Sequence, residues 1–313
     1  MERHYPTEDW PEVVPRNLNP RYPEVLPLVD DGDQGTYTLV VNKGTTKLCV
    51  RKTLKKVLRG DESPDRWRRE VEVIRNLRHE NIQVYRHACL CLIQGDIYLE
   101  YCSYGPLSHV KSYMDANGLP IPEAFAKHMF KGLVSALAYL QHGIHELGDV
   151  RRPERWSRQW TPTWHCDITI DSVSLQRYPS DVLPVAKLCK FNFACQPTRV
   201  GDTYNVPAWS QNAGTQGWVP PEHPTKSGRT DVFQIGAVIQ CLCTPNWVAA
   251  DPEEGLPSQY SEDFQTMIWD AMTPEVADRP NAAQLAMLFD DDLPPQFASM
   301  PLQAYERVHA NIV

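Results

Sequence analysis

Apolar and polar residues alternate along the first hundred residues with the period of two that is typical of β-strands. The clearest case is a pair of β-rich runs, 36–42 and 46–52, which flank Lys43-Gly44-Thr45 and predict a hairpin. Three further strands are predicted at 25–29, 84–93 and 96–101. Apolar residues at helical spacing occur once in this region, over Arg66–Arg78. The pattern therefore predicts a small β-rich region with one helix.

After Ser103–Pro106, which we interpret as a hinge, the pattern changes to helical spacing. A long amphipathic helix is predicted over Ile121–His142, and a buried helix over Asp231–Cys243, which is apolar nearly all round. Two shorter helices are predicted at 261–272, with Ser261 as the cap, and at 282–289. The expected fold class is α+β, with an extension (1–20), a β-rich lobe (21–102), a mainly helical lobe (103–295) and a tail (296–313).

Composition narrows the class of protein. The 313 residues are 42% hydrophobic and 22% charged, as in ordinary globular proteins. A net charge of -8 argues against nucleic-acid and membrane-surface partners, and no apolar run reaches the ~20 residues that span a bilayer. The first ten residues lack the apolar core of a secretory signal, so we expect a cytoplasmic or nuclear protein. The nine cysteines lack zinc-site spacing, so we expect reduced thiols and no metal ligands.

The central chemical motifs are His165-Cys166-Asp167-Ile168-Thr169-Ile170-Asp171-Ser172 and, after a turn-rich spacer, Lys190-Phe191-Asn192. Their order and spacing resemble the catalytic loop, H-R-D-L-K-x-x-N, and the metal-binding loop, D-F-G, of eukaryotic protein kinases. The resemblance covers roughly residues 24–291. It implies a bilobal protein-kinase-like fold, with a small β-rich N-lobe that carries one helix and a larger helical C-lobe.

Other family positions follow in order. Gly32 and Gly35 match two glycines of the Gly-rich loop, and Lys52 and Glu70 match the strand lysine and its helical partner. The hinge of the family corresponds to Glu100-Tyr101-Cys102, and three C-lobe positions correspond to Glu222, Asp231 and Arg279. Gly214-Thr215 resembles Ser/Thr kinases, and the sequence before His165 resembles fungal NimA-related-like kinases in particular.

Three positions that bind metal ions or phosphate in the family have different residues in this chain. The two metal-holding positions are Ser172 and Lys190, and Thr169 replaces a lysine that contacts the transferred phosphate. A lysine repels a cation, and a lone serine hydroxyl is a poor ligand for Mg²⁺, which prefers carboxylate oxygens. Both metal anchors of the family are therefore missing, and Mg²⁺ is not expected to bind.

Other family positions keep their residues, and each has two interpretations. Asp167 occupies the place of the catalytic base, or it accepts local hydrogen bonds in a loop. Lys52 and Glu70 form a phosphate-anchoring pair, or a pair that only stabilises the lobe. ATP binding is expected to be weak, because Tyr37, Val50 and Ser174 alter the purine pocket by roughly 1 kcal/mol for each methylene-sized change. If ATP binds, the resemblance places it at Gly32, Gly35, Lys52, Glu100, Cys102 and Lys190, with the Lys190 ammonium contacting phosphates in place of a metal.

Two further features bear on regulation. Cys166 replaces the arginine that receives an activation-loop phosphate in the family, so that switch is not expected. His165 and Phe191 are kept, and the resemblance implies that they pack in the hydrophobic spine. An insert at 148–162 is dense in Arg and Trp, and it either docks an acidic partner or stacks over the back of the lobe.

These residues lead to two hypotheses. The first is a pseudokinase, a scaffold or regulator that binds a protein partner, with weak or no ATP binding and no appreciable phosphoryl transfer. The alternative is an atypical ATP-dependent Ser/Thr kinase that uses Lys52, Glu70, Asp167 and Thr215, with Lys190 replacing a metal. Capture of a non-nucleotide ligand has no support in the sequence. The sequence also does not identify the partner or the oligomeric state.

Overall fold

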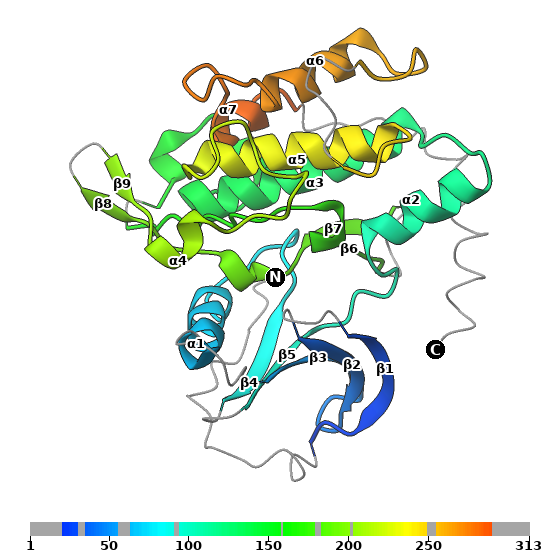
Figure 1. The fold of residues 1–313 in the computed structure, drawn as a ribbon, viewed down its shortest axis with the longest axis vertical. Coiled ribbons are helices and arrows are strands. Elements are labelled where there is room, and N and C mark those ends of the chain that lie inside the picture. The colour runs from blue at the N-terminus through cyan, green and yellow to red at the C-terminus, as the bar shows by residue number, and fades with distance from the viewer. Residues whose placement is uncertain are drawn as a thin grey trace. The chain divides into compact units, whose positions relative to one another are not determined.

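The computed structural model describes residues 21–30, 35–55, 63–90, 94–157, 159–178, 183–200, 203–248 and 255–289. These residues form two compact units (Figure 1). The N-terminal unit runs to Arg78 and resumes over Gln83–Tyr101, and the C-terminal unit takes His79–Ile82 and the chain from Cys102 on. Each unit is built around its own core. The predicted extension (1–20), the tail (296–313) and Gly32 lie outside the described residues.

The N-terminal unit is a five-stranded antiparallel sheet in the order β1-β2-β3-β5-β4, with one helix, α1. This content matches the pattern of apolar residues. The β2–β3 hairpin turns where it is predicted, and Thr46, with φ of 58°, belongs to the turn instead of the second strand. The bounds are β1 Glu24–Asp30, β2 Thr36–Asn42, β3 Lys47–Lys55, α1 Ser63–Ile74, β4 Tyr85–Leu90 and β5 Gln94–Glu100.

Helix α1 packs on the sheet through Trp67, whose side chain is 3% exposed. A Cβ on Gly95 of β5 would lie 3.0 Å from the indole, so the absence of a side chain at Gly95 lets the helix approach the strand. The helix ends at Ile74, four residues before the predicted end at Arg78. The predicted helix is too long because Leu77 continues the helical spacing of buried apolar residues, although Leu77 lies after the end of the helix.

The C-terminal unit is mainly helical, with α3 and α5 lying side by side (Figure 1), and its described residues also form two two-stranded sheets, β6–β7 and β8–β9. Helix α5 begins at a capping box formed by Ser227 and Thr230, and α3 ends at Gly143, whose φ of 70° requires a left-handed backbone. The helices are α2 Leu107–Ala116, α3 Glu123–His142, α4 Ala208–Gln211, α5 Gly228–Cys243, α6 Glu262–Ala271 and α7 Ala282–Ala286; the strands are β6 Val173–Gln176, β7 Val185–Leu188, β8 Thr198–Val200 and β9 Thr203–Asn205.

The structure confirms the long helices and corrects the reading of two segments. The Ser261 hydroxyl accepts a hydrogen bond from the Phe264 N–H at 3.3 Å, so the predicted cap of α6 is present. Helix α2 follows the hinge directly and was missed by the sequence analysis. The segment 195–222, read as irregular, contains the β8–β9 hairpin and α4. Among the described residues, none of the helices combines the length and the apolar character that a membrane crossing needs.

The Trp residues of the 148–162 insert pack against the C-terminal unit. The Trp160 indole N–H donates to the Leu140 carbonyl at 2.9 Å, and its ring lies 4.8 Å from that of Tyr139. The Trp156 indole N–H donates to the Asp149 carbonyl at 3.1 Å. These contacts agree with the stacking interpretation for the Trp residues, while Arg151, Arg152 and Arg155 stay exposed and Arg158 lies outside the described residues.

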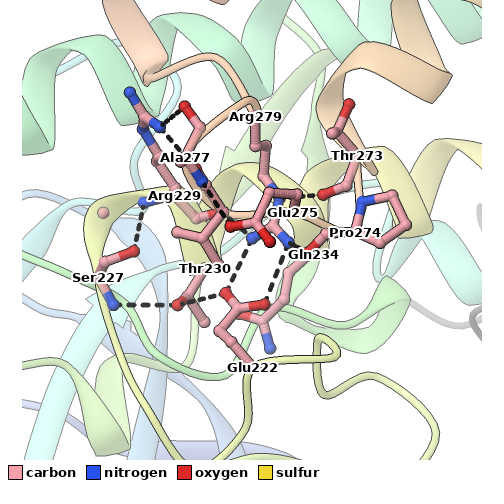
Figure 2. Close-up of polar contacts among 12 residues, drawn as sticks. Glu222, Ser227, Arg229, Thr230, Gln234, Thr273, Pro274, Glu275, Ala277 and Arg279 are labelled. Atoms are coloured by element: carbon pink, nitrogen blue, oxygen red, sulfur yellow. Dashed lines mark hydrogen bonds and ion pairs between the residues drawn. The ribbon is translucent and has the colours of Figure 1, made fainter.

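A buried ion pair joins two distant parts of the C-terminal unit (Figure 2). The Arg279 guanidinium, fully buried, donates to both carboxylate oxygens of Glu222 at 2.8 and 3.1 Å. Its remaining N–H groups donate to the carbonyls of Thr273, Arg229 and Pro274. The guanidinium also lies 4.9 Å from the Phe233 ring centroid. Because every side of the cation has a partner, its removal leaves several groups unpaired.

We expect Arg279→Ala to lower the free energy of unfolding by about 3–5 kcal/mol, because it leaves the Glu222 carboxylate uncompensated. The matched control is Arg152→Ala, which removes an exposed arginine 3.8 Å from Asp149 and should cost less than about 1 kcal/mol. Denaturant unfolding of the two variants measures both values. Equal losses in the two variants would contradict the role given to Arg279.

A histidine in the C-terminal unit is held neutral by its surroundings. The His79 ring stacks on Tyr139 at 4.9 Å, its Nδ1 accepts from the Asn81 N–H at 3.1 Å, and its Nε2 lies 3.4 Å from the Ser135 hydroxyl. Burial, together with the nearby charges of His145 and Lys187, lowers the pKa of His79 to about 4. The protonated ring is therefore disfavoured in the folded chain.

The stability of the chain should consequently fall in acid through His79. The unfolded residue titrates near 6.5 and the folded one near 4, so its contribution is complete above about pH 6.5 and is lost as the pH falls toward 4. We expect a loss of up to about 3 kcal/mol over this window, which His79→Asn should largely remove. Urea unfolding at several pH values measures the difference between wild type and variant. A difference that does not change with pH would contradict the assignment.

Candidate functional site

Lys52 and Glu70 meet inside the N-terminal unit, from β3 and α1 respectively. The Lys52 Nζ lies 2.8 Å from each Glu70 carboxylate oxygen, and the side chains are 1% and 3% exposed. The pair ties α1 to the sheet with no ligand present, because each charge satisfies the other. Its geometry fits both interpretations from the sequence, a phosphate anchor and a purely structural pair.

Gly35, the described member of the two predicted loop glycines, has a structural reason to be glycine. Its φ is +114°, and a Cβ there would lie 2.7 Å from the Thr53 carbonyl oxygen. The residue thus lets β2 begin directly against β3. The close approach to Thr53 by itself explains why residue 35 is a glycine.

Glu100, the predicted hinge residue at the end of β5, has its polar groups engaged by Gln83 and Val84. Its backbone N–H donates to the Val84 carbonyl at 2.8 Å, and its carboxylate accepts from the Val84 N–H at 3.1 Å. Its backbone carbonyl accepts from the Gln83 side-chain amide at 2.8 Å. A purine edge at this residue would have to share that carbonyl with Gln83. Cys102, the other hinge residue of the prediction, is buried in the C-terminal unit, and its carbonyl accepts from the Gly105 N–H at 3.0 Å.

The catalytic-loop segment of the C-terminal unit is held by a buried carboxylate on α5. The two Asp231 oxygens accept from the N–H groups of His165 and Cys166, each at 2.8 Å. Burial raises the pKa of Asp231, and the nearby His165 together with these N–H donors opposes the rise. Gln234, one turn along the helix, accepts from the Ile168 N–H at 3.0 Å. Helix α5 therefore sets the backbone path on both sides of Asp167.

Both carboxylate oxygens of Asp167 accept hydrogen bonds from Thr215. The Thr215 N–H donates to one oxygen at 2.7 Å, and its hydroxyl donates to the other at 3.2 Å. The preceding Gly214 has a φ of +138°, and a Cβ there would lie 2.6 Å from Val219, so this tight path requires glycine. A carboxylate that takes a proton from a substrate hydroxyl must present a lone pair to it, and each carboxylate oxygen has two. In this arrangement a substrate hydroxyl would share the carboxylate with Thr215.

The Ser172 hydroxyl is engaged within its own loop. It accepts from the Thr169 N–H and donates to the Thr169 carbonyl, both at 2.8 Å. The neighbouring Asp171 side chain is exposed, as expected of a residue on the outer side of the turn. Ser172 thus preserves the shape of the loop, and its one hydroxyl proton is already donated.

Lys190 follows β7 with a left-handed backbone, φ 61°, and is half-buried. Next to it, the Phe191 ring lies 4.8 Å from the His165 ring, and His165 Nε2 lies 2.8 Å from the Cys189 carbonyl oxygen. The loop therefore keeps its packing while it carries a cation. Among the described residues, no group of three or more His, Cys, Asp or Glu side chains could hold a metal ion.

Lys226 is a further positioning residue that the sequence analysis missed. Its ammonium, 6% exposed, donates to the carbonyls of Cys166 at 3.1 Å and Ala213 at 2.6 Å. It therefore links the catalytic-loop segment to the segment that carries Thr215. A lysine between Thr225 and Ser227 has no sequence signal for this role, because its acceptors are carbonyls 13 and 60 residues away.

Comparisons with known proteins place these features in a family. The family model named "Protein kinase domain" matches residues 24–287. The chain is 26% identical over 292 residues to the G2-specific protein kinase nim-1 of Neurospora crassa, covering 85% of this chain and 33% of that protein. It is 23% identical over 244 residues to the serine/threonine-protein kinase SRK2I of Arabidopsis thaliana, covering 77% of this chain and 58% of that protein.

A probable receptor-like protein kinase of Arabidopsis thaliana is 25% identical over 205 residues, with 63% of this chain and 28% of that protein covered. The chain thus spans from about a quarter to somewhat over half of the length of these relatives. The match to the family model extends from β1 to just past α7 and includes every site residue described above. The chain therefore belongs to the eukaryotic Ser/Thr protein kinase family and has the α+β, bilobal kinase-like fold of that family.

Proposed function

We propose that the chain is a pseudokinase, a scaffold or regulator that transfers no phosphate. The observation that carries the proposal is the pair of residues at the two metal positions. The Ser172 hydroxyl is used by the Thr169 backbone, with both contacts at 2.8 Å, and Lys190 stands at the second position. Phosphoryl transfer in this family depends on metal ions that bridge and neutralise the phosphates.

An ammonium opposes a metal ion at such a site by simple electrostatics. Two unit charges ~4 Å apart interact by roughly 4 kcal/mol at an effective dielectric constant near 20, so an ammonium and a divalent ion repel by roughly 8 kcal/mol. Mg²⁺ also requires several oxygen ligands in near-octahedral geometry. The residues at these positions do not fit the ion, and we infer that Mg²⁺ is not bound there.

The N-terminal unit supports weak or absent ATP binding. The Glu100 carbonyl, one of the groups at which the resemblance places ATP, already accepts from the Gln83 side-chain amide at 2.8 Å. A purine would gain only what this carbonyl can share, because the present hydrogen bond must be weakened to make a new one.

The role that remains is recognition of another protein. The exposed Arg151, Arg152 and Arg155 lie beside Trp side chains that are held in place, and Arg and Trp are enriched at binding hot spots. We propose an acidic protein partner for these local arginines and a cytoplasmic or nuclear location. The negative net charge of the whole chain opposes nucleic-acid binding.

We expect the wild-type chain to transfer no radiolabelled phosphate to a generic substrate above the level of Asp167→Asn. ATP with Mg²⁺ should raise its melting temperature no more than ATP alone. The double variant Ser172→Asn with Lys190→Asp restores oxygen ligands, and aspartate tolerates the left-handed backbone at 190. This variant should gain a shift that depends on Mg²⁺.

The control for the double variant is Asp171→Asn, which changes an exposed carboxylate of the same loop and should gain nothing. Wild-type turnover that disappears in Asp167→Asn would overturn the proposal. Titration of both variants with Mn²⁺, in the absence of nucleotide, separates metal binding from nucleotide binding.

An atypical Ser/Thr kinase is the second candidate function, and the intact Lys52–Glu70 pair favours it. In this alternative the Lys190 ammonium contacts the phosphates directly, and Asp167 exchanges its Thr215 bonds for a substrate hydroxyl. It requires ATP to raise the melting temperature without metal, and Lys52→Met to abolish that shift. Absence of any shift at millimolar ATP removes this alternative.

A further inference from the structure

Two buried thiols of the C-terminal unit lie close enough to react with each other. The sulfur atoms of Cys166 and Cys195 are 3.8 Å apart, and each side chain is 1% exposed. They come from different segments, one beside Asp167 and the other four residues after Phe191. Since an S–S bond measures about 2.05 Å, small rotations of the two side chains would bring the sulfurs to bonding distance.

The backbone around the pair holds the two segments in register. Trp164 and Cys195 form an antiparallel bridge in which each N–H donates to the carbonyl of the other residue at 2.9 Å. On the other side, the Lys226 ammonium holds the Cys166 carbonyl at 3.1 Å. Both cysteines are therefore kept facing each other by hydrogen bonds that do not involve their sulfur atoms.

A metal site does not explain this pair. Soft metal ions need further thiolate or imidazole ligands, commonly four in all. Among the described residues no cluster of three such side chains exists. The side chains that pack against the two cysteines include Trp164, Val206, Phe193 and Trp209, and a polar neighbour is the Ser210 hydroxyl.

We propose that Cys166 and Cys195 form a reversible disulfide when the chain meets hydrogen peroxide. This is a modification site that lies outside the proposed scaffold function and does not depend on it. The bond would join the catalytic-loop segment covalently to the segment that follows Phe191.

The surroundings of the two sulfurs differ, and the difference orders the steps. The hydrogen bond from the Cys166 thiol lowers the pKa of Cys195, with help from the Ser210 hydroxyl and the Lys226 charge. The same hydrogen bond, together with burial, raises the pKa of Cys166. Because the thiolate is the nucleophile, Cys195 reacts with peroxide first and Cys166 is the resolving thiol.

The reaction balances with peroxide as the oxidant. The Cys195 thiolate attacks one peroxide oxygen, the O–O bond breaks, and sulfenic acid and hydroxide form. The Cys166 sulfur then attacks the sulfenic sulfur, the S–O bond breaks, and the departing hydroxide takes the Cys166 proton to become water. In sum, two thiols and one peroxide give one disulfide and two waters.

Some of the side chains that cover the pair are only partly buried. Trp164 stacks edge-on against Tyr204, which is 43% exposed, and Phe193 and Trp209 over the cluster are only half-buried. Small movements of these rings would admit a molecule little larger than water. The disulfide would then fix the backbone next to Asp167. Cys166 stands where the family has the arginine that receives an activation-loop phosphate, so this position has no phosphate switch.

The test treats the full chain with hydrogen peroxide, blocks remaining thiols after unfolding, and maps linked peptides by mass spectrometry without reduction. We expect a Cys166–Cys195 linkage that dithiothreitol reverses, and a rise in melting temperature of roughly 5–10 °C in the oxidised chain. Cys195→Ser and Cys166→Ser should each abolish both results, since serine keeps the size and the hydrogen bond.

The matched control is Cys243→Ala, whose buried thiol has its pKa raised to about 12 and should not react. This variant should form the linkage as wild type does. The half-buried Cys89 reports general oxidation. Oxidation of Cys89 while Cys166 and Cys195 stay reduced would overturn the proposal, and so would sulfinic acid at Cys195 with no linkage.

Discussion

A single buried carboxylate sets the geometry of the C-terminal unit. Asp231 lies on α5, the most deeply buried helix, and its two oxygens fix the N–H groups of His165 and Cys166 at 2.8 Å. A carboxylate without water is costly unless donors surround it, so the loop cannot leave Asp231 without exposing an unpaired charge to the core. The position of Asp167 follows from this constraint and requires no ligand.

The same principle recurs at the other charges that shape the molecule. Arg279 and Glu222 join two distant parts of the C-terminal unit, and Lys52 and Glu70 hold α1 to the sheet of the N-terminal unit. In each pair the protein itself supplies the compensating charge. Ion pairs within the chain therefore stabilise the kinase fold. Residues that only contact phosphates in the family can change without loss of the fold.

The altered positions are filled by contacts within the chain. Ser172 closes a small hydrogen-bonded ring with Thr169, and Lys190 precedes the turn in which the Phe191 ring packs near the His165 ring. These replacements are neutral or cationic, whereas phosphoryl transfer needs anionic groups that hold metal ions. The Trp side chains beside the proposed docking arginines are likewise held by hydrogen bonds within the chain, so little entropy is lost when a partner docks there.

The sequence by itself determined the secondary structure, the family and the chemical identity of the substituted positions. Periods of two and 3.6, the Lys43–Thr45 turn and the Ser261 cap are local signals, so they can be read from neighbouring residues. The pattern left element ends imprecise and missed α2, α4 and the β8–β9 hairpin, because contacts with distant segments decide them. Only the tertiary structure decided which groups meet: Gln83 with the Glu100 carbonyl, Lys226 with two distant carbonyls, and Cys166 with Cys195. The physical reason is that these contacts depend on where segments up to 60 residues apart come to lie, and no local pattern encodes that distance.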